Sequence, residues 1–385
     1  MILFRMILKN AFRRKFRTGL TILATGIAIL AFGLLRTVIT TWYGSAEATS
    51  ANRLVTRNAV SIIFPLPLSY YEKIRHAEGV SEVSYGNWFG GIYISEKNFF
   101  ASFAMDTETY LKLMKEFLIP EGQKQDFLRD RRGALVGRGL MDRFGWKLGD
   151  VVTLKGTIYP GEWPFVIRAV YRGRTPSVDE TQFVFHYEYL NEAIKGTMPS
   201  LANQVGYFSV GIRNPGEAAD IASEIDAMFT NSPAETLTET EKAFVMGFIS
   251  MSEAIIRVIQ AVSLVIIVII LAVVANTMAM TTRERTGEYA VLKTLGYSGP
   301  RITILIVGEA LVVTCLGALL GILLTYPAAF GFKTALKQFF PVFIVDPLTV
   351  ALDAGVALLV GVAASILPAR QAVKTRIAEG LRRIG

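Results

Sequence analysis

The chain has 385 residues, of which 52% are hydrophobic and 19% are charged. This composition is too apolar for an ordinary soluble enzyme and too charged for a chain that lies wholly within a membrane. A single cysteine excludes a disulfide within the chain, and two histidines far apart in sequence argue against a His/Cys metal site. The formal net charge of +8 would suit a nucleic-acid partner only if the basic residues lay on a soluble domain.

Four apolar stretches are long enough to cross a membrane, which takes about 20 residues. We predict transmembrane helices over 19–42, 253–280, 302–326 and 350–367. The first stretch is longer than the apolar core of a signal peptide and follows eighteen other residues, so a retained span is favoured over a cleaved leader.

The basic residues concentrate in three short segments. Segments 1–18, 281–301 and 368–385 together carry 15 basic and 3 acidic residues, whereas segment 40–257 carries 22 basic and 26 acidic residues. Short loops rich in Lys and Arg stay in the cytoplasm. We therefore predict cytoplasmic termini and a cytoplasmic 281–301 loop, with 43–252 and 327–349 outside. The slightly acidic soluble segment disfavours nucleic acid as a partner.

Residues 43–252 form one insertion between the first two predicted spans. Alternating apolar patterns predict strands, and helical periodicity predicts helices. The strands are expected at Ala59–Phe64, Val80–Ser84, Val151–Leu154, Phe165–Tyr171 and Tyr207–Arg213, and the helices at Leu68–Ala77 and Glu217–Phe229. The strand–helix–strand unit at the start of the insertion and the strand–helix unit at its end predict an α+β layer. The short β runs between these two units predict a small barrel or sandwich. The expected fold class is a membrane protein with four transmembrane α-helices and one large α+β extracytoplasmic domain inserted between helices 1 and 2.

The 281–301 loop contains the pattern of a short amphipathic helix. Tyr289, Leu292 and Leu295 share one face, Val291 flanks it, and Gly296 is placed to end the helix. The apolar face needs a cover. The inner membrane surface and a groove in a partner protein satisfy that need equally well.

The same loop carries a family resemblance. The run from Arg285 to Gly296 (Arg-Thr-Gly-Glu-Tyr-Ala-Val-Leu-Lys-Thr-Leu-Gly) resembles the signature of MacB/LolC/FtsX-type ABC transporter permeases. Residues Glu288, Lys293, Leu295 and Gly296 fit that signature, and residues Gly287, Tyr289 and Ala290 depart from it. Further similar stretches are the basic segment Leu8–Thr18, Gly133–Leu154 in the soluble segment, Pro368–Ala372 and Glu379–Arg382.

The resemblance implies a coupling helix that docks into a separate ABC ATPase subunit. Its implied coupling residues are Arg285, Glu288, Tyr289, Leu292, Lys293, Leu295 and Gly296. The chain has no Gly-x-x-x-x-Gly-Lys-[Ser/Thr] phosphate loop, so no cofactor is expected in it, and ATP with Mg would be bound by the partner ATPase. Other implied partners are a second copy or a homologous permease, membrane lipid, a periplasmic adaptor and an outer-membrane protein. The implied location is the bacterial inner membrane.

By family resemblance, ATP-driven motion of the periplasmic domain exports or extracts a lipoprotein, peptide or small molecule. The alternative is an FtsX-like signalling subunit that activates an extracytoplasmic partner, such as a cell-wall hydrolase, without moving cargo. Neither function needs catalytic residues in this chain, and no nucleophile–base pair or paired catalytic carboxylates stand out in the sequence. The expected chain is a transporter membrane subunit rather than an enzyme.

Small residues recur within the first and third predicted spans. Gly19, Gly26 and Gly33 are spaced by seven residues, and Gly317 and Gly321 form a Gly-x-x-x-Gly motif. Small residues let membrane helices approach closely. The pattern fits packing within one chain and fits a homodimer seam.

Three ionisable residues, Arg36, Glu309 and Asp353, lie within or beside the predicted spans. Charged groups inside a membrane are costly and need partners. For Glu309 we favour a buried hydrogen bond to Ser, Thr or backbone over proton or substrate handling. For Asp353 we predict an ion pair with Arg36 or Arg257.

Overall fold

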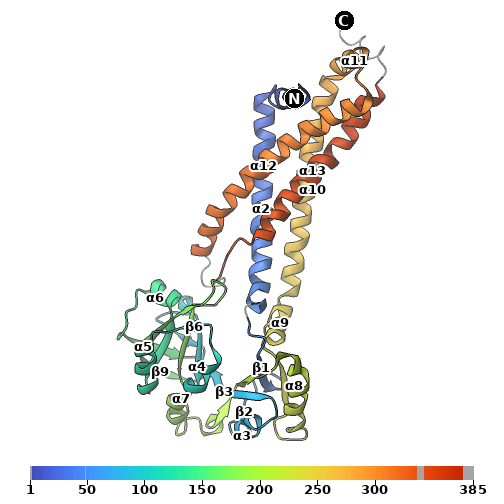
Figure 1. The fold of residues 1–385 in the computed structure, drawn as a ribbon. Coiled ribbons are helices and arrows are strands. Elements are labelled where there is room, and N and C mark those ends of the chain that lie inside the picture. The colour runs from blue at the N-terminus through green and yellow to red at the C-terminus, as the bar shows by residue number, and fades with distance from the viewer. Residues whose placement is uncertain (1, 48, 336–341, 376–385) are drawn as a thin grey trace. The chain divides into compact units, whose positions relative to one another are not determined.

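The computed structural model describes residues 2–47, 49–335 and 342–375. These residues fall into two compact units (Figure 1). The membrane unit comprises the described residues of 1–41, 252–335 and 343–385. The large domain comprises those of 42–251 together with residue 342.

Four of the described helices are long and apolar enough to cross a membrane, over Lys15–Gly44, Glu253–Glu284, Gly299–Phe332 and Pro347–Lys374. The complete helices are α2 (Lys15–Glu47), α10 (Glu253–Glu284), α12 (Gly299–Ala335) and α13 (Pro347–Lys374). Two shorter helices belong to the same unit: α1 (Ile2–Ala11) precedes α2, and α11 (Thr286–Thr294) lies between α10 and α12. The large domain lies between α2 and α10 in the chain. The predicted fold class of four membrane helices and one inserted α+β domain is confirmed.

Each long helix extends beyond its predicted apolar stretch. Hydropathy marks only the part of a helix that suits hydrocarbon, whereas backbone hydrogen bonds continue into the polar interface. Helix α13 extends at both ends: Pro347 starts it, and Pro368 lies inside it without ending it. The family-like segment 368–372 is therefore part of helix α13.

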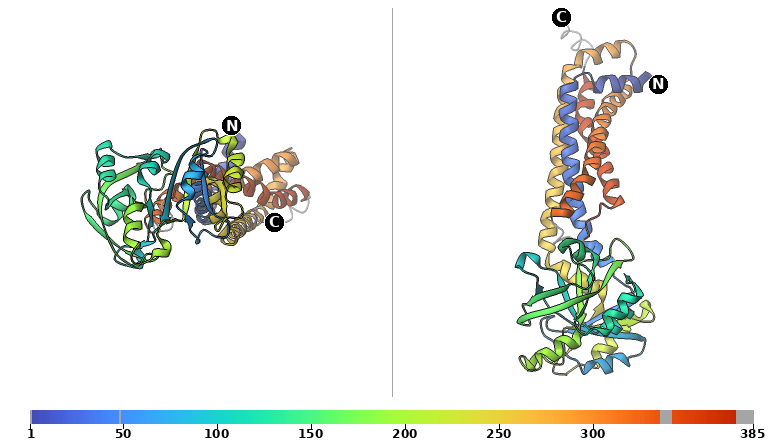
Figure 2. Two further views of the ribbon diagram at one scale, coloured as in Figure 1. Left: turned by 90° about the horizontal axis from the view of Figure 1, so that it is seen from below. Right: turned by 90° about the vertical axis from the view of Figure 1, so that its left-hand side faces the viewer.

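Helices α12 and α13 pack along each other, and α10 packs along α13 (Figure 2). The shared core holds Ile302, Ile306 and Ala310 from α12 against Ala357, Val360 and Ala364 from α13. Alanine and glycine on α13 permit this close approach, as small residues do in membrane bundles. A Cβ added at Gly361 would lie 2.5 Å from the Thr314 hydroxyl oxygen.

Four of the five predicted packing glycines contact residues of their own chain. A Cβ on Gly317 would lie 2.6 Å from Thr25 Cβ, and one on Gly321 would lie 2.6 Å from the Gly26 carbonyl oxygen. A Cβ on Gly33 would lie 2.8 Å from an Asp353 carboxylate oxygen, whereas Gly19 has no atom within 4 Å of that position. Packing within the chain accounts for these contacts at Gly26, Gly33, Gly317 and Gly321.

Gly321→Ala is expected to destabilise the membrane unit by about 1–3 kcal/mol, because the methyl group meets backbone that cannot rotate away. Gly355 on α13 has open space around its Cβ position, so Gly355→Ala is the matched control and gains helix propensity. Thermal unfolding of the full chain in detergent measures both. Equal melting temperatures for Gly321→Ala and the wild type would contradict the close contact of α2 with α12.

One half of the large domain is an α+β layer. Strands β1 (Arg53–Asn58), β3 (Val80–Trp88), β12 (Tyr207–Ile212) and β13 (Thr236–Thr240) run in the order β13-β1-β12-β3, and every neighbouring pair is antiparallel. Helices α3 (Tyr70–Arg75) and α8 (Ala218–Ala227) pack on this sheet through Ile74, Ile221 and Ile225. The predicted strand and helix at the end of the insertion are confirmed by β12 and α8, and the predicted helix and second strand at its start by α3 and β3.

The strand predicted at Ala59–Phe64 is wrong. The strand is Arg53–Asn58, and the following residues form a turn that leaves Val60 and Ile63 exposed. The residues of β1 are buried on both faces of the strand, so its sequence lacks the alternation that marks a half-exposed strand.

The other half of the large domain is a small barrel. From β3 the sheet continues through β5 (Ala101–Met105), β10 (Gln182–His186), β7 (Gly133–Gly137), β9 (Gly161–Gly173) and β8 (Val151–Gly156) to β4 (Gly91–Ile92). Because β4 directly follows β3 in the chain, its pairing with β8 closes the ring. Phe89, Phe165, Phe183 and Phe185 fill the interior. Of the two predicted forms, barrel and sandwich, the barrel is observed.

The remaining described elements of the large domain are short helices, 3-10 turns and short strands. The helices are α4 (Thr107–Leu113), α5 (Glu121–Arg129), α6 (Arg138–Phe144), α7 (Tyr187–Ile194) and α9 (Glu241–Met251), with 3-10 turns at Glu96–Asn98, Pro199–Leu201 and Pro215–Glu217. The short strands are β2 (Leu66–Pro67), which pairs with β11 (Gln204–Val205), and β6 (Phe117–Leu118), which pairs with β9. Helix α9 is the last element of the large domain before α10 begins.

Candidate functional site

Helix α11 occupies the loop that carries the family-like signature. It ends at Gly296, whose φ of 88° is readily adopted only by glycine. The Gly296 amide donates to the Lys293 carbonyl, and the Tyr297 amide donates to the Leu292 carbonyl at 3.0 Å each. These two bonds form a Schellman cap, so Gly296 ends the helix as its position in the sequence predicts.

The buried face of α11 packs into its own membrane unit. Tyr289 and Ala290 are 2% exposed, and Tyr289 joins the core formed with α10, α12 and α13. Leu292 packs against the edge of the same core. Burial raises the pKa of Tyr289 to about 12. Contrary to our prediction, Tyr289 is therefore not open to the membrane surface or to a partner, whereas Leu292 is only partly buried.

The exposed face of α11 is rotated around the helix relative to the predicted face of Tyr289, Leu292 and Leu295. Glu288, Val291 and Leu295 follow each other at intervals of three and four residues, so they share a face. Val291 is 40% exposed and Leu295 is 71% exposed. Of the predicted apolar coupling residues, only Leu295 lies on this face, and Val291 joins it. Exposed apolar side chains beside an acidic one suit a protein partner.

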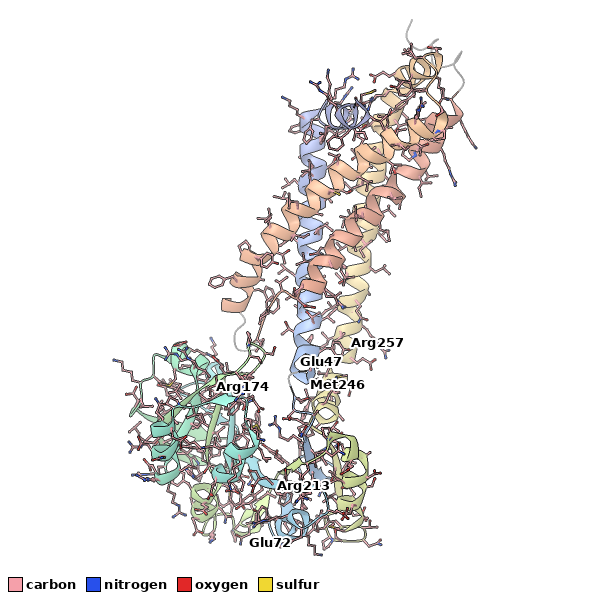
Figure 3. The ribbon with its side chains drawn as sticks, in the orientation of Figure 1. Glu47, Glu72, Arg174, Arg213, Met246 and Arg257 are labelled. Atoms are coloured by element: carbon pink, nitrogen blue, oxygen red, sulfur yellow. The ribbon has the colours of Figure 1, made fainter. Side chains whose placement is uncertain are left out.

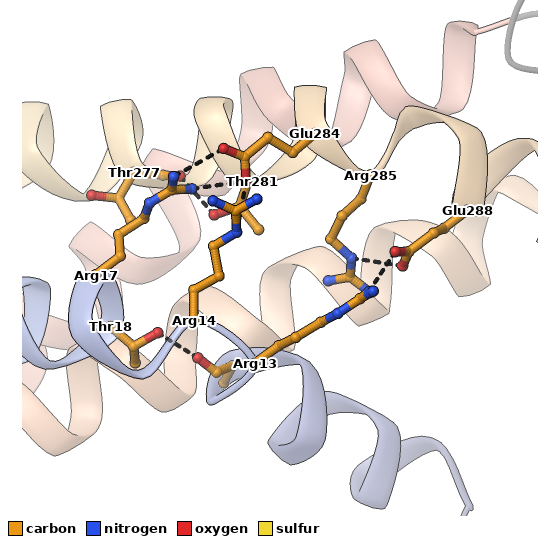
Figure 4. Close-up of polar contacts among 10 residues, drawn as sticks. Arg13, Arg14, Arg17, Thr18, Thr277, Thr281, Glu284, Arg285 and Glu288 are labelled. Carbon is orange, nitrogen blue, oxygen red and sulfur yellow. Dashed lines mark hydrogen bonds and ion pairs between the residues drawn. The ribbon is translucent and has the colours of Figure 1, made fainter. Parts of the chain in front are cut away.

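Two acids of the loop bind the basic segment at the start of the chain (Figure 4). Arg17 donates to Glu284 at 2.9 and 3.0 Å, and Arg13 pairs with Glu288. Hydrogen bonds from Arg13 and Arg285 lower the pKa of Glu288, although burial opposes that shift. Sequence reasoning missed these pairs. One sequence feature could have indicated them. Glu284 and Glu288 are the only acids of the 281–301 loop, which was predicted to lie on the same side of the membrane as segment 1–18, whose charged residues are all basic.

Arg285 joins α11 to the interior of α12. Its guanidinium donates to Glu288 at 3.0 Å and to Glu309 at 2.9 Å, and the Glu309 side chain is only 7% exposed. Burial alone would lower the pKa of Arg285, but Tyr289, Glu309 and Glu288 together raise it. The partner of Glu309 is thus an arginine of the signature, and not the Ser, Thr or backbone group that we predicted.

Lys293 joins α11 to the end of α13. Its ammonium donates to the carbonyl oxygens of Val373 and Thr375 at 2.7 Å each. A cation at the carboxyl end of a helix satisfies free carbonyls and complements the helix dipole. Helix α11 is therefore fixed to the α1–α2 segment, to α12 and to α13 by three different charged side chains.

The predicted ion pair of Asp353 is absent. No ion pair joins Asp353 to Arg36 or Arg257 in the described part of the chain, and both of its carboxylate oxygens are buried without a hydrogen-bond partner. Arg257 pairs instead with Glu253, one turn earlier on its own helix, at 2.8 Å. A local partner four residues away is nearer than one on another helix.

Comparison with known families supports the membrane unit's assignment. Residues 261–377 match the family model described as FtsX-like permease C-terminal. Residues 261–377 therefore resemble the C-terminal part of an FtsX-like permease. The match begins within α10 and includes α11, α12 and α13. An FtsX-like permease is a multi-pass membrane subunit of a transporter, and its family works with ABC ATPase partners.

Solved structures similar to this chain include three domains of transporter or permease proteins. The extracellular domain of the noncanonic ABC-type transporter YknZ from Gram-positive bacteria has 12% identity and a TM-score of 0.36, covering 49% of this chain and 100% of that one. The periplasmic region of MacB from Actinobacillus actinomycetemcomitans has 10% identity and a TM-score of 0.36, covering 52% and 92%. A domain of a putative permease protein from Porphyromonas gingivalis has 13% identity and a TM-score of 0.33, covering 49% and 88%. No curated protein matches the chain.

Proposed function

We propose that this permease couples ATP hydrolysis by a separate ABC ATPase to movement of its large domain, and that this movement drives export or extraction of a substrate. The observation that carries the proposal is the position of α11. Its Val291 and Leu295 are open to a partner, while Arg285 and Lys293 hold it to the other membrane helices. A partner that moves the open face moves the ends of those helices as well.

The charge distribution supports the orientation that this function needs. The segments before α2, between α10 and α12, and after α13 carry the excess of Lys and Arg, which favours a cytoplasmic position. We therefore propose that α11 lies in the cytoplasm, where ATP is available, and that the large domain lies outside. In a bacterium this corresponds to the inner membrane, with two permease copies, or this chain and a homologous permease, acting together.

An aromatic cavity of ≈ 440 Å³ in the large domain favours transport over signalling without cargo. A purely mechanical subunit needs no ligand cavity, whereas a transporter handles a lipoprotein, a peptide or a small molecule. A periplasmic adaptor and an outer-membrane protein would receive that cargo. The signalling alternative would require an extracytoplasmic partner, such as a cell-wall hydrolase, to bind the same domain.

Replacing the two open apolar residues with acids is expected to prevent ATPase association. The double variant Val291→Asp/Leu295→Asp places charge at the centre of the proposed contact, where loss of a central apolar residue costs about 2 kcal/mol or more. Copurification of the ATPase with the tagged permease is expected to fall at least tenfold. Neither residue belongs to the membrane core, so the melting temperature of the permease itself is expected to stay unchanged.

The matched control is Val60→Asp/Ile63→Asp, the same kind of change at two exposed residues in a turn of the large domain. This control is expected to copurify normal amounts of ATPase. Normal copurification with Val291→Asp/Leu295→Asp would refute the docking face. Copurification without any stimulation of ATPase activity by the wild-type permease would refute the coupling.

A further inference from the structure

The large domain contains a cavity of ≈ 440 Å³ whose lining includes seven aromatic side chains. Trp88 and Phe103 contribute rings from β3 and β5, Phe117 and Tyr207 from β6 and β12, and Phe244 and Phe248 from α9. This volume lies within the range of about 300–1,000 Å³ that is usual for small-molecule sites. Trp88 and Phe248 are also partly exposed, so the cavity opens to the outside of the domain.

One wall of the cavity is formed by a buried ion cluster. Arg53 lies between Glu116 and Glu241, with closest N–O distances of 2.6 and 2.8 Å. The guanidinium makes five hydrogen bonds, four to these two carboxylates and one to the Leu113 carbonyl. Because an arginine has five N–H donors, Arg53 has none left for a ligand.

The cluster leaves the cavity with negative charge. Two carboxylates face a single guanidinium, and both glutamates are more accessible than the arginine between them, whose side chain is 4% exposed. Asp179 adds a third acid to the lining. An anionic ligand would meet these carboxylates without a free cation to bind it. A neutral apolar ligand would gain nothing from them.

We propose that this cavity binds an apolar organic cation, a positively charged group carried on an aromatic or aliphatic body. The rings receive the body of such a ligand, and a cation near ring faces gains further attraction from their negative quadrupoles. Glu116 and Glu241 provide the compensating charge. Aromatic walls and an excess of carboxylates together distinguish this ligand class from fatty acids, phosphates and neutral lipids.

The ligand would also contact the segment that enters the membrane unit. Phe244 and Phe248 belong to α9, as does Glu241, and α9 ends at Met251, two residues before α10 begins. Occupancy of the cavity would therefore restrain the part of the chain that precedes the second span. A bound cation would therefore act on α10 through α9.

Binding of tetraphenylphosphonium to the full chain in lipid nanodiscs tests the site. Tetraphenylborate has the same shape and the opposite charge, and empty nanodiscs give the background for both ions. The wild-type permease is expected to bind tetraphenylphosphonium saturably, at one ion per chain and at least tenfold more tightly than tetraphenylborate. The measurement needs neither ATPase nor nucleotide, so its result is independent of the proposed coupling.

Phe244→Ala/Phe248→Ala is expected to weaken tetraphenylphosphonium binding at least tenfold. Met246 and Met251 lie on the same helix and do not line the cavity, so Met246→Ala/Met251→Ala is the matched control and should bind normally (Figure 3 labels Met246). Absence of saturable binding, equal affinity for the two ions, or an unchanged affinity in Phe244→Ala/Phe248→Ala would each overturn the proposal.

Discussion

Arg285→Met is expected to destabilise the membrane unit by about 3–5 kcal/mol, the usual effect of removing one partner of a buried ion pair. The substitution leaves Glu309 with no ion-pair partner within the described residues, while its side chain stays 7% exposed inside α12. It also releases Glu288 from one of its two arginines. Thermal unfolding of the full chain in detergent, followed by tryptophan fluorescence, measures the loss.

The double variant Arg285→Met/Glu309→Leu is expected to recover most of that stability, because apolar residues can replace a buried ion pair at little cost. The double-mutant cycle should give a coupling energy of about 2 kcal/mol. The recovered protein is also expected to stimulate its ATPase poorly, because α11 has lost its connection to α12. Stability without coupling would separate the mechanical role of the pair from its structural role.

Arg257→Met is the matched control, since Arg257 (labelled in Figure 3) forms an exposed ion pair with Glu253 on α10. Exposed pairs contribute little to stability, so this variant should unfold like the wild type. Additive losses from Arg285→Met and Glu309→Leu would show that the two side chains do not interact. That result would remove the proposed link between α11 and α12.

The four spans were predictable because their signal is a local one. A stretch of about 20 apolar residues has few structural uses outside a membrane. The excess of Lys and Arg in segments 1–18, 281–301 and 368–385 predicts that all three lie on the cytoplasmic side. The ends of the helices were less predictable. Helix α13 continues through Pro368 to Lys374, since neighbouring helices in a bundle compensate for the hydrogen bond that a proline removes.

The contacts of α11 were only partly predictable. Periodicity identifies an amphipathic helix and its end at Gly296, but it does not say which neighbour covers the apolar face. Tyr289 is covered by the chain's own helices, which shifts the open face to Val291 and Leu295. The arginine partner of Glu309 is 24 residues away, beyond any helical spacing that a sequence pattern can reveal.

In the large domain, a strand whose sequence alternates between large apolar and small or polar residues was found, and a strand whose sequence lacks that alternation was displaced. Strand β12 alternates and was placed correctly. The sequence of β1 does not alternate, and its first residue, Arg53, resembles a loop residue in sequence although it is almost fully buried. The closure of the barrel depends on the two residues of β4 and their pairing with β8. Such a short strand has no sequence pattern of its own.

Arg53→Met is expected to destabilise the large domain by about 3–5 kcal/mol, because it leaves Glu116 and Glu241 close together without their shared cation. Arg53 also connects β1 to the segment after α4 and to α9, so its loss should loosen α9 first. Urea unfolding of the full chain measures the change. Arg57→Met, four residues along the same strand, removes a single pair with Glu239 and should cost about 1 kcal/mol or less.

The variant Arg53→Met/Glu116→Leu/Glu241→Leu connects this stability argument to the cavity. Removing all three charges is expected to restore most of the stability lost in Arg53→Met, because no buried charge remains unpaired. The same variant should lose the preference for tetraphenylphosphonium over tetraphenylborate, since two of the carboxylates that distinguish the ions are gone. A folded variant that still prefers the cation would assign the selectivity to the aromatic rings and Asp179 rather than to the glutamates around Arg53.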